Sequence, residues 1–161
     1  MAEQNREQAT RTFETLCAAL DGENWNYRRD DENLRVEYTV SGEDLPMSFL
    51  FSVDAEHTLV RLVSPMPLTV KEDKRLETTV AVSMINDKLV NGCFDFNILT
   101  GELSFRICNS FCVSVLGAEV FLYMLAVSIH TVDQFNDMLF MLATGVISME
   151  KFMEMFGEVT G

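Results

Sequence analysis

Basic residues are scarce in this chain. Twelve Lys and Arg stand against 25 Asp and Glu, which gives a formal net charge of −13 over 161 residues. The basic side chains do not form a patch, since Arg28–Arg29 is followed at once by Asp30–Asp31. Proteins bind nucleic acids largely by neutralising phosphates with Lys and Arg, and anionic membranes attract polybasic segments. We therefore expect neither a nucleic-acid partner nor a membrane partner.

Long apolar runs are missing as well. The N-terminus has no apolar segment that could act as a secretory signal. In the most apolar stretch, GAEVFLYMLAVSIH, the uninterrupted apolar run extends only from Val120 to Val127, whereas a bilayer-spanning helix needs about 20 residues. These absences predict a cytoplasmic protein. In that compartment most of the four cysteines should be free thiols.

The residue patterns that carry catalysis are also absent. The two histidines, His57 and His130, lie far apart and have no second ligand at metal-binding spacing. There is no GxSxG motif, no glycine-rich phosphate loop and no cysteine with a plausible histidine base. The acidic residues cluster between the predicted strands, where Asp and Glu usually initiate turns and stay solvated. We predict no catalytic residues, no metal site and no cofactor, and therefore no enzyme.

A period of three to four residues predicts helices at both ends of the chain. The first helix ends at Asp21–Gly22. After Val115 the pattern is helical again, from about 117 to 143. It breaks at Thr144–Gly145 and restarts over about 148–157, with Ser148 as the N-cap.

Between these helices the apolar residues alternate with a period of two. Four short strands are predicted, over 24–29, 34–40, 47–53 and 58–64. Pro65 and Pro67 then close the sheet, and a second helix opens at Thr69 or Val70 and runs to about Val90. A hairpin follows over 93–107. The pattern predicts a single α+β domain over residues 1–161, with helices packed on an antiparallel sheet that has one solvated face.

The hairpin raises a question about two cysteines. A two-residue turn at Thr100–Gly101 would place Cys93 directly opposite Cys108, and Asp95 opposite Arg106. A loop one residue longer at each end would instead place Cys93 opposite Arg106. In a reducing cytoplasm we expect both thiols to be free.

The helix over about 117–143 carries more apolar surface than one small sheet can cover. Between Glu119 and His130 it has no charged side chain, so it must be buried on nearly every side. Part of it is therefore expected to face another chain, and a symmetric dimer is the commonest arrangement. Each candidate could equally pack in the chain's own core. The candidates for the dimer or partner surface are Phe121, Met124, Phe135, Met138 and Met141.

The helix and hairpin over 84–107 carry Ile85–Asn86, Phe94, Thr100–Gly101, Phe105 and Arg106 in this order. This run resembles the YbjN-like proteins of bacteria. In that family a helix ending in an Ile-Asn pair leads to a Gly-Phe strand, then an acidic or Thr-Gly turn, then a strand with an aromatic residue and an Arg. Upstream, Trp25 and Tyr27 before an Asp-rich turn, and the segment VSPMPLTV (63–70), look like the family's opening strand and its strand-to-helix joint.

The resemblance implies an α-β-β-β-α-β-β-α arrangement similar to type III secretion chaperones. Those are small, acidic, usually dimeric proteins that hold extended segments of other proteins. YbjN-like proteins are labelled sensory transduction regulators, which specifies no chemistry and brings no catalytic residue to this chain. Two features depart from the family pattern: the long helical C-terminus after Gly145, and Cys93 at the point where the motif enters its strand.

We therefore expect a non-enzymatic cytoplasmic interaction module, chaperone-like or regulatory. It should be a homodimer that binds a protein segment through apolar helix or sheet surface. The alternative is a small-molecule sensor with a pocket between sheet and helix, on which Trp25, Arg61 and Arg106 would converge. An enzyme of unrecognised type is a second rival, and it would need a cleft of titratable groups with strongly shifted pKa values.

Overall fold

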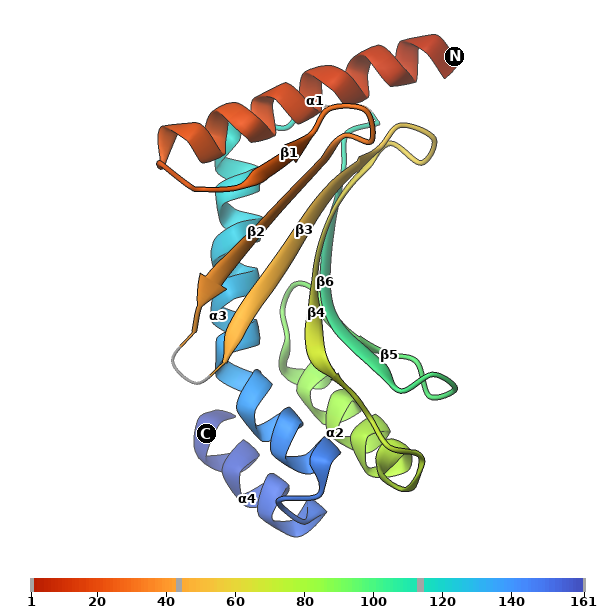
Figure 1. The fold of residues 1–161 in the computed structure, drawn as a ribbon, viewed down its shortest axis with the longest axis vertical. Coiled ribbons are helices and arrows are strands. Elements are labelled where there is room, and N and C mark those ends of the chain that lie inside the picture. Colours follow the sequence, from red (N-terminus) through yellow and green to blue (C-terminus); the bar gives the residue numbers. More distant parts are fainter. Residues whose placement is uncertain (1, 43–44, 113–114, 161) are drawn as a thin grey trace.

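The computed structural model describes residues 2–42, 45–112 and 115–160 (Figure 1). It is a mixed α and β fold, as the sequence predicts. The helices are α1 (Ala2–Gly22), a short 3₁₀ turn η1 (Glu72–Lys74), α2 (Arg75–Lys88), α3 (Ala118–Thr144) and α4 (Met149–Thr160). The strands are β1 (Arg28–Asp30), β2 (Arg35–Ser41), β3 (Pro46–Asp54), β4 (Leu59–Thr69), β5 (Cys93–Phe96) and β6 (Glu102–Ser110).

Within the described residues the six strands form one antiparallel sheet in the order β1-β2-β3-β4-β6-β5. The helix α3 runs behind the sheet along its length, α1 crosses one end of the sheet, and α2 and α4 lie at the other end (Figure 1). Burial alternates along the strands: in β2, Val36 and Tyr38 are buried while Arg35, Glu37 and Thr39 are exposed. The sheet therefore has one face packed on helices and one open face.

The first predicted strand is shorter than expected. Only Arg28–Asp30 pairs with β2, and residues 24–27 lie outside the sheet. The backbone of Asn24 has a positive φ of 57°, and the Trp25 N–H donates to the carbonyl of Leu20 at 3.0 Å. This bond caps the C-terminus of α1, so the alternating residues that looked like a strand serve instead to end the helix.

The prediction that Pro65 and Pro67 close the sheet is wrong. The strand β4 continues to Thr69, and the second helix begins only at Arg75, after η1, and ends at Lys88. Pairing between β3 and β4 stops at Leu50 and Val63, whereas β4 stays paired with β6 through Thr69 across a bulge. The two strands therefore separate beyond Val63, as Figure 1 shows.

Pro65 lies on the edge of β4 that this separation leaves unpaired, and Pro67 follows it within the bulge. The carbonyl of Thr58 accepts from Phe111, next to β6, so even-numbered residues of β4 point their backbone groups toward β6. Backbone groups alternate along a strand, which directs Pro65 toward the opening beside β3. A proline has no N–H to leave unpaired there, and it also discourages pairing with a foreign strand. Pro65 thus marks where β4 leaves β3.

The hairpin has the second of the two predicted registers, the one with a loop one residue longer at each end. Cys93 lies opposite Arg106, and Phe94 lies opposite Phe105. The side-chain oxygen of Asn97 accepts from the N–H groups of Leu99 (3.0 Å) and Thr100 (3.2 Å), which builds a loop over 97–101 in place of a two-residue turn. Cys93 and Cys108 are therefore not cross-strand partners, and all four cysteines are free.

The two C-terminal helices have the predicted boundaries to within about three residues. Gly117 is the N-cap of α3. Gly145, with φ of 80°, ends the helix by donating its N–H to the carbonyl of Leu142 at 3.0 Å. The Ser148 hydroxyl accepts from the Lys151 N–H at 3.2 Å, which confirms the predicted N-cap of α4. Four residues connect α3 to α4, and α4 turns back to pack against α3 and α2.

Candidate partner-binding surfaces

Four of the five predicted partner-surface residues lie in the chain's own core. Phe121 and Met124 are 0% exposed, Phe135 is 2% exposed and Met138 is 4% exposed, while Met141 is half-buried. The reason is that α3 packs on the sheet along one side and on α1, α2 and α4 along others, so its buried stripe is wide. This corrects the placement of Phe121, Met124, Phe135 and Met138 on an exposed surface, while Met141 stays partly accessible.

One uncovered apolar surface lies on the outer side of α3. A groove of about 560 Å³ is lined there by Trp25 and by Leu122, Leu125, Ala126 and Ile129 of α3. We call this the Trp25 groove. Its polar rim is made by Glu23, His130 and Asp133.

The ring of Trp25 is held in place from two sides. Its backbone N–H caps α1 through Leu20, and its ring meets the buried ring of Tyr38 edge-on, with centroids 5.5 Å apart. Aromatic pairs favour this T-shaped arrangement. Trp25 is therefore held in place, and part of its side chain remains accessible for a ligand.

A second uncovered apolar surface lies on α2 and the β5–β6 loop. Leu76 is 73% exposed, Val80 51%, Ile98 43% and Leu99 83%. The guanidinium of Arg75, at the start of α2, donates to the carbonyls of Ile98 (3.2 Å) and Leu99 (2.8 Å), which ties the loop to the helix. We call these four apolar residues the α2–hairpin surface.

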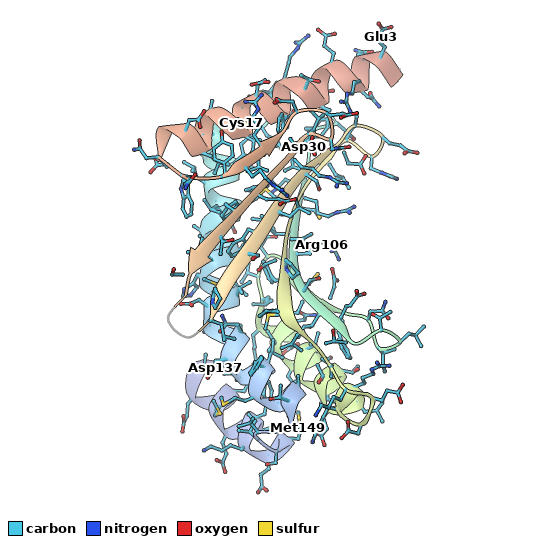
Figure 2. The ribbon with its side chains drawn as sticks, in the orientation of Figure 1. Glu3, Cys17, Asp30, Arg106, Asp137 and Met149 are labelled. Atoms are coloured by element: carbon cyan, nitrogen blue, oxygen red, sulfur yellow. The ribbon has the colours of Figure 1, made fainter. Side chains whose placement is uncertain are left out.

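The open face of the sheet carries a polar cluster around Arg106, which projects from β6 (Figure 2). Its guanidinium forms a two-pronged ion pair with Asp95, through Nε–Oδ2 (2.5 Å) and Nη2–Oδ1 (3.0 Å). The same group donates to the sulfur atoms of Cys93 (3.5 Å) and Cys108 (3.7 Å). Arg106 therefore separates two thiols that the short-turn register would have brought together.

This cluster offers little chemistry. Hydrogen bonds from Arg106 lower the pKa of Asp95 below its usual range, so the carboxylate stays ionised. Burial and the charge of Asp95 raise the pKa of the Cys93 thiol, which stays protonated and is a poor nucleophile. Across the residues that the structure describes, no group of three or more His, Cys, Asp or Glu could hold a metal ion.

The residues proposed for a sensor pocket do not converge. Trp25 lies on the helix-covered side of the sheet, against Tyr38. Arg61 and Arg106 alternate with buried residues of β4 and β6 and so lie on the open face. The sequence missed the Trp25 groove because Trp25 looked like a strand residue and α3 is apolar on nearly every side. None of the described helices is long and apolar enough to cross a bilayer.

Comparisons with known proteins agree with this fold. A family model described as "YbjN: Putative bacterial sensory transduction regulator" matches residues 12–141. The crystal structure of YbjN from E. coli is similar with a TM-score of 0.54 and 12% identity, over 75% of this chain and 85% of that one.

Two complexes are similar to the same degree. The ExsC-ExsE complex gives a TM-score of 0.51 and 14% identity, over 81% of this chain and 95% of the matched chain. The HopA1-SchA chaperone-effector complex gives 0.52 and 11%, over 74% and 88%. At such identities the likeness shows the fold alone. No curated protein sequence matches this chain.

Proposed function

This chain belongs to the YbjN family, and on that premise we propose that it is a non-enzymatic protein-interaction module, chaperone-like or regulatory. The module is a single α+β domain that acts as a homodimer in the cytoplasm and binds a segment of another protein. Two of the similar structures are complexes, one of them a chaperone with its effector, which supports a protein as the partner.

The observation that carries this proposal is the pair of apolar surfaces that the chain leaves uncovered. The core is filled by the buried faces of the sheet and helices, yet the Trp25 groove and the α2–hairpin surface remain accessible. Scattered exposed apolar residues are ordinary, but apolar residues gathered on one element with a charged surround are typical of interaction sites. Two such surfaces suit a protein that binds both a second copy and a client.

The α2–hairpin surface is the better candidate for self-association. It lies beside β5, the last strand of the described sheet, whose outer edge is already closed at Phe94 by the Asn86 side chain of α2 (3.0 and 2.8 Å). The free strand edge is therefore short, and the exposed apolar side chains are what a partner would cover. In a symmetric dimer the same patch from each copy meets, so these side chains would be buried against their own copies.

We expect Val80→Glu to dissociate the dimer. A carboxylate placed at the centre of a desolvated interface, facing its own copy, weakens association at least about tenfold. Light scattering on the wild type and the variant measures this directly. Val159→Glu is the matched control, since Val159 is also exposed, at 41%, but lies on α4. A monomeric wild type, or a Val80→Glu variant that stays dimeric, contradicts the proposed interface.

We expect a protein client to co-purify with the chain from its source organism. Tagged wild-type protein, isolated at low salt and analysed by native mass spectrometry, should carry a second polypeptide in a fixed ratio. A bound small molecule in place of a polypeptide would favour the sensor alternative, for which the Trp25 groove is large enough. A bare dimer with nothing bound contradicts the client-binding function.

A further inference from the structure

We propose that the Trp25 groove binds a basic amphipathic helix of the partner, with its apolar face against α3 and Lys or Arg residues along its edges. This inference rests on the proposed function and adds to it the place and the chemistry of the client segment.

The shape of the α3 side fits a helix laid along it. Leu122, Ala126 and Ile129 follow one another at spacings of four and three residues, which makes a ridge on one face of α3. Ala126, the small residue in the middle, is exposed and leaves a notch between two larger neighbours. Ridges of one helix pack into such gaps on another, so a large apolar side chain of the partner can sit over Ala126.

Trp25 lines the groove together with this ridge. Its ring packs edge-on against Tyr38, and its backbone N–H binds the end of α1, so both the side chain and the backbone are held. Tryptophan is one of the residues that most often contribute much of the binding energy at protein interfaces. The α3 ridge and Trp25 therefore fit a partner helix whose apolar residues recur every three to four positions.

The charge around the groove selects basic flanks. Glu23 and Asp133 line its rim. The helix α3 carries three acidic residues and neither Lys nor Arg. Electrostatic attraction acts over roughly 10 Å at moderate salt, so Lys or Arg residues beside the apolar stripe of the partner fall within the field of Glu23 and Asp133. An acidic segment would be repelled.

A selection experiment tests the apolar and the charged part together. Random peptides displayed on phage are selected on the full-length protein and counter-selected on an Ala126→Glu variant. Ala126 is exposed and Glu is a good helix former, so the variant keeps its fold. We expect the surviving sequences to share apolar residues at helical spacing with Lys or Arg between them. Survivors that are acidic or lack this spacing, or an absence of survivors, overturn the proposal.

The affinity of a selected peptide is then read at the site itself. Trp25 is the only tryptophan of the chain, so its emission should shift to shorter wavelength when a peptide covers the ring. We expect Ala126→Glu to weaken binding at least about tenfold and raised salt to weaken it further. Ala18→Glu is the matched control, because Ala18 is exposed on α1 outside the groove, and should bind normally. Equal binding by both variants overturns the proposal.

The groove as the binding site and protein binding as the function can be disproved separately. If the co-purifying client is retained by the Ala126→Glu variant, the Trp25 groove is not its site, while the protein-binding function stands. If purified chain binds neither a client nor selected peptides, both fall. A third outcome would be a small apolar molecule that shifts Trp25 emission and prevents every peptide from binding. That outcome would place the sensor function in this groove and overturn the helix proposal.

Discussion

Replacing Phe135 with Ala is expected to lower the free energy of unfolding by about 3–5 kcal/mol. Phe135 is 2% exposed and joins three parts of the fold. Its ring lies 6.3 Å from that of Phe94 on β5 and 6.4 Å from that of Phe156 on α4, measured between centroids. Truncation leaves a cavity where sheet, α3 and α4 meet, and these rigid elements can close it only partly.

Urea unfolding followed by circular dichroism measures this loss. The protein concentration is held constant, because dimerisation would add a concentration-dependent contribution to the apparent stability. Tyr123→Ala is the control on the same helix, since Tyr123 is 50% exposed and its loss should change stability by no more than about 0.5 kcal/mol. A loss of stability for Phe135→Ala as small as that for Tyr123→Ala would mean that Phe135 does not pack in the core. Phe135 would then be a surface candidate again.

The helices at both ends of the chain could be predicted because several local signals agree there. In α3 the apolar period, the N-cap Gly117 and the left-handed Gly145 all mark the same boundaries, and Ser148 starts α4. Each signal acts within one or two turns of helix, so no knowledge of the tertiary structure is needed. The alternating strands β2 and β3 were predictable for the same reason.

The errors occur where long-range pairing decides the structure. Proline lacks an N–H wherever it stands, but whether Pro65 ends a strand depends on whether a neighbouring strand needs that N–H. Here β3 has already separated from β4, so the strand continues. In the hairpin, Asn97 and the Thr100–Gly101 pair both favour turns, and the Asn97 side chain determines which loop forms.

The partner surface was the least predictable feature, for a reason that α3 makes plain. A helix with apolar residues on nearly every side gives no periodic signal to distinguish its core face from its accessible face. Phe121 and Leu122 are adjacent and equally apolar, yet the first is fully buried and the second lines the Trp25 groove. Their difference depends on where the sheet, α1 and Trp25 lie, and these are set by the whole fold.

The acidic composition offsets a risk that the accessible apolar surfaces create. A chain that leaves apolar residues accessible risks non-specific association, and a large net charge of one sign opposes it. Under the proposal of a basic partner helix, the acidic residues of α3 would also repel acidic proteins, which would limit partners to those that supply positive charge.

Replacing Gly101 with Ala is expected to cost at least about 2 kcal/mol, because two penalties add. Gly101 has a φ of 81°, which strains any residue with a Cβ. An added Cβ would also lie 2.4 Å from the backbone oxygen of Val70. The N–H of the same residue, Val70, donates to the Gly101 carbonyl at 2.8 Å and holds the two segments together. The new Cβ would therefore force the end of β4 and the hairpin apart.

The same change should reach the proposed dimer surface, and this distinguishes it from a simple loss of stability. The loop that contains Ile98 and Leu99 is closed by the Gly101 N–H, which donates to the carbonyl of Asn97 at 2.7 Å. Arg75 binds that loop only in its closed form, because two adjacent carbonyls must face the guanidinium. We therefore expect Gly101→Ala both to lower the urea midpoint and to weaken self-association in light scattering. Gly157→Ala, in the last turn of α4 with no atom within 4 Å of the new Cβ, should instead raise stability by up to roughly 0.5 kcal/mol and leave the dimer intact. If Gly101→Ala destabilises the fold but the dimer persists at concentrations where the variant is still folded, the hairpin loop lies outside the interface and α2 alone must form it.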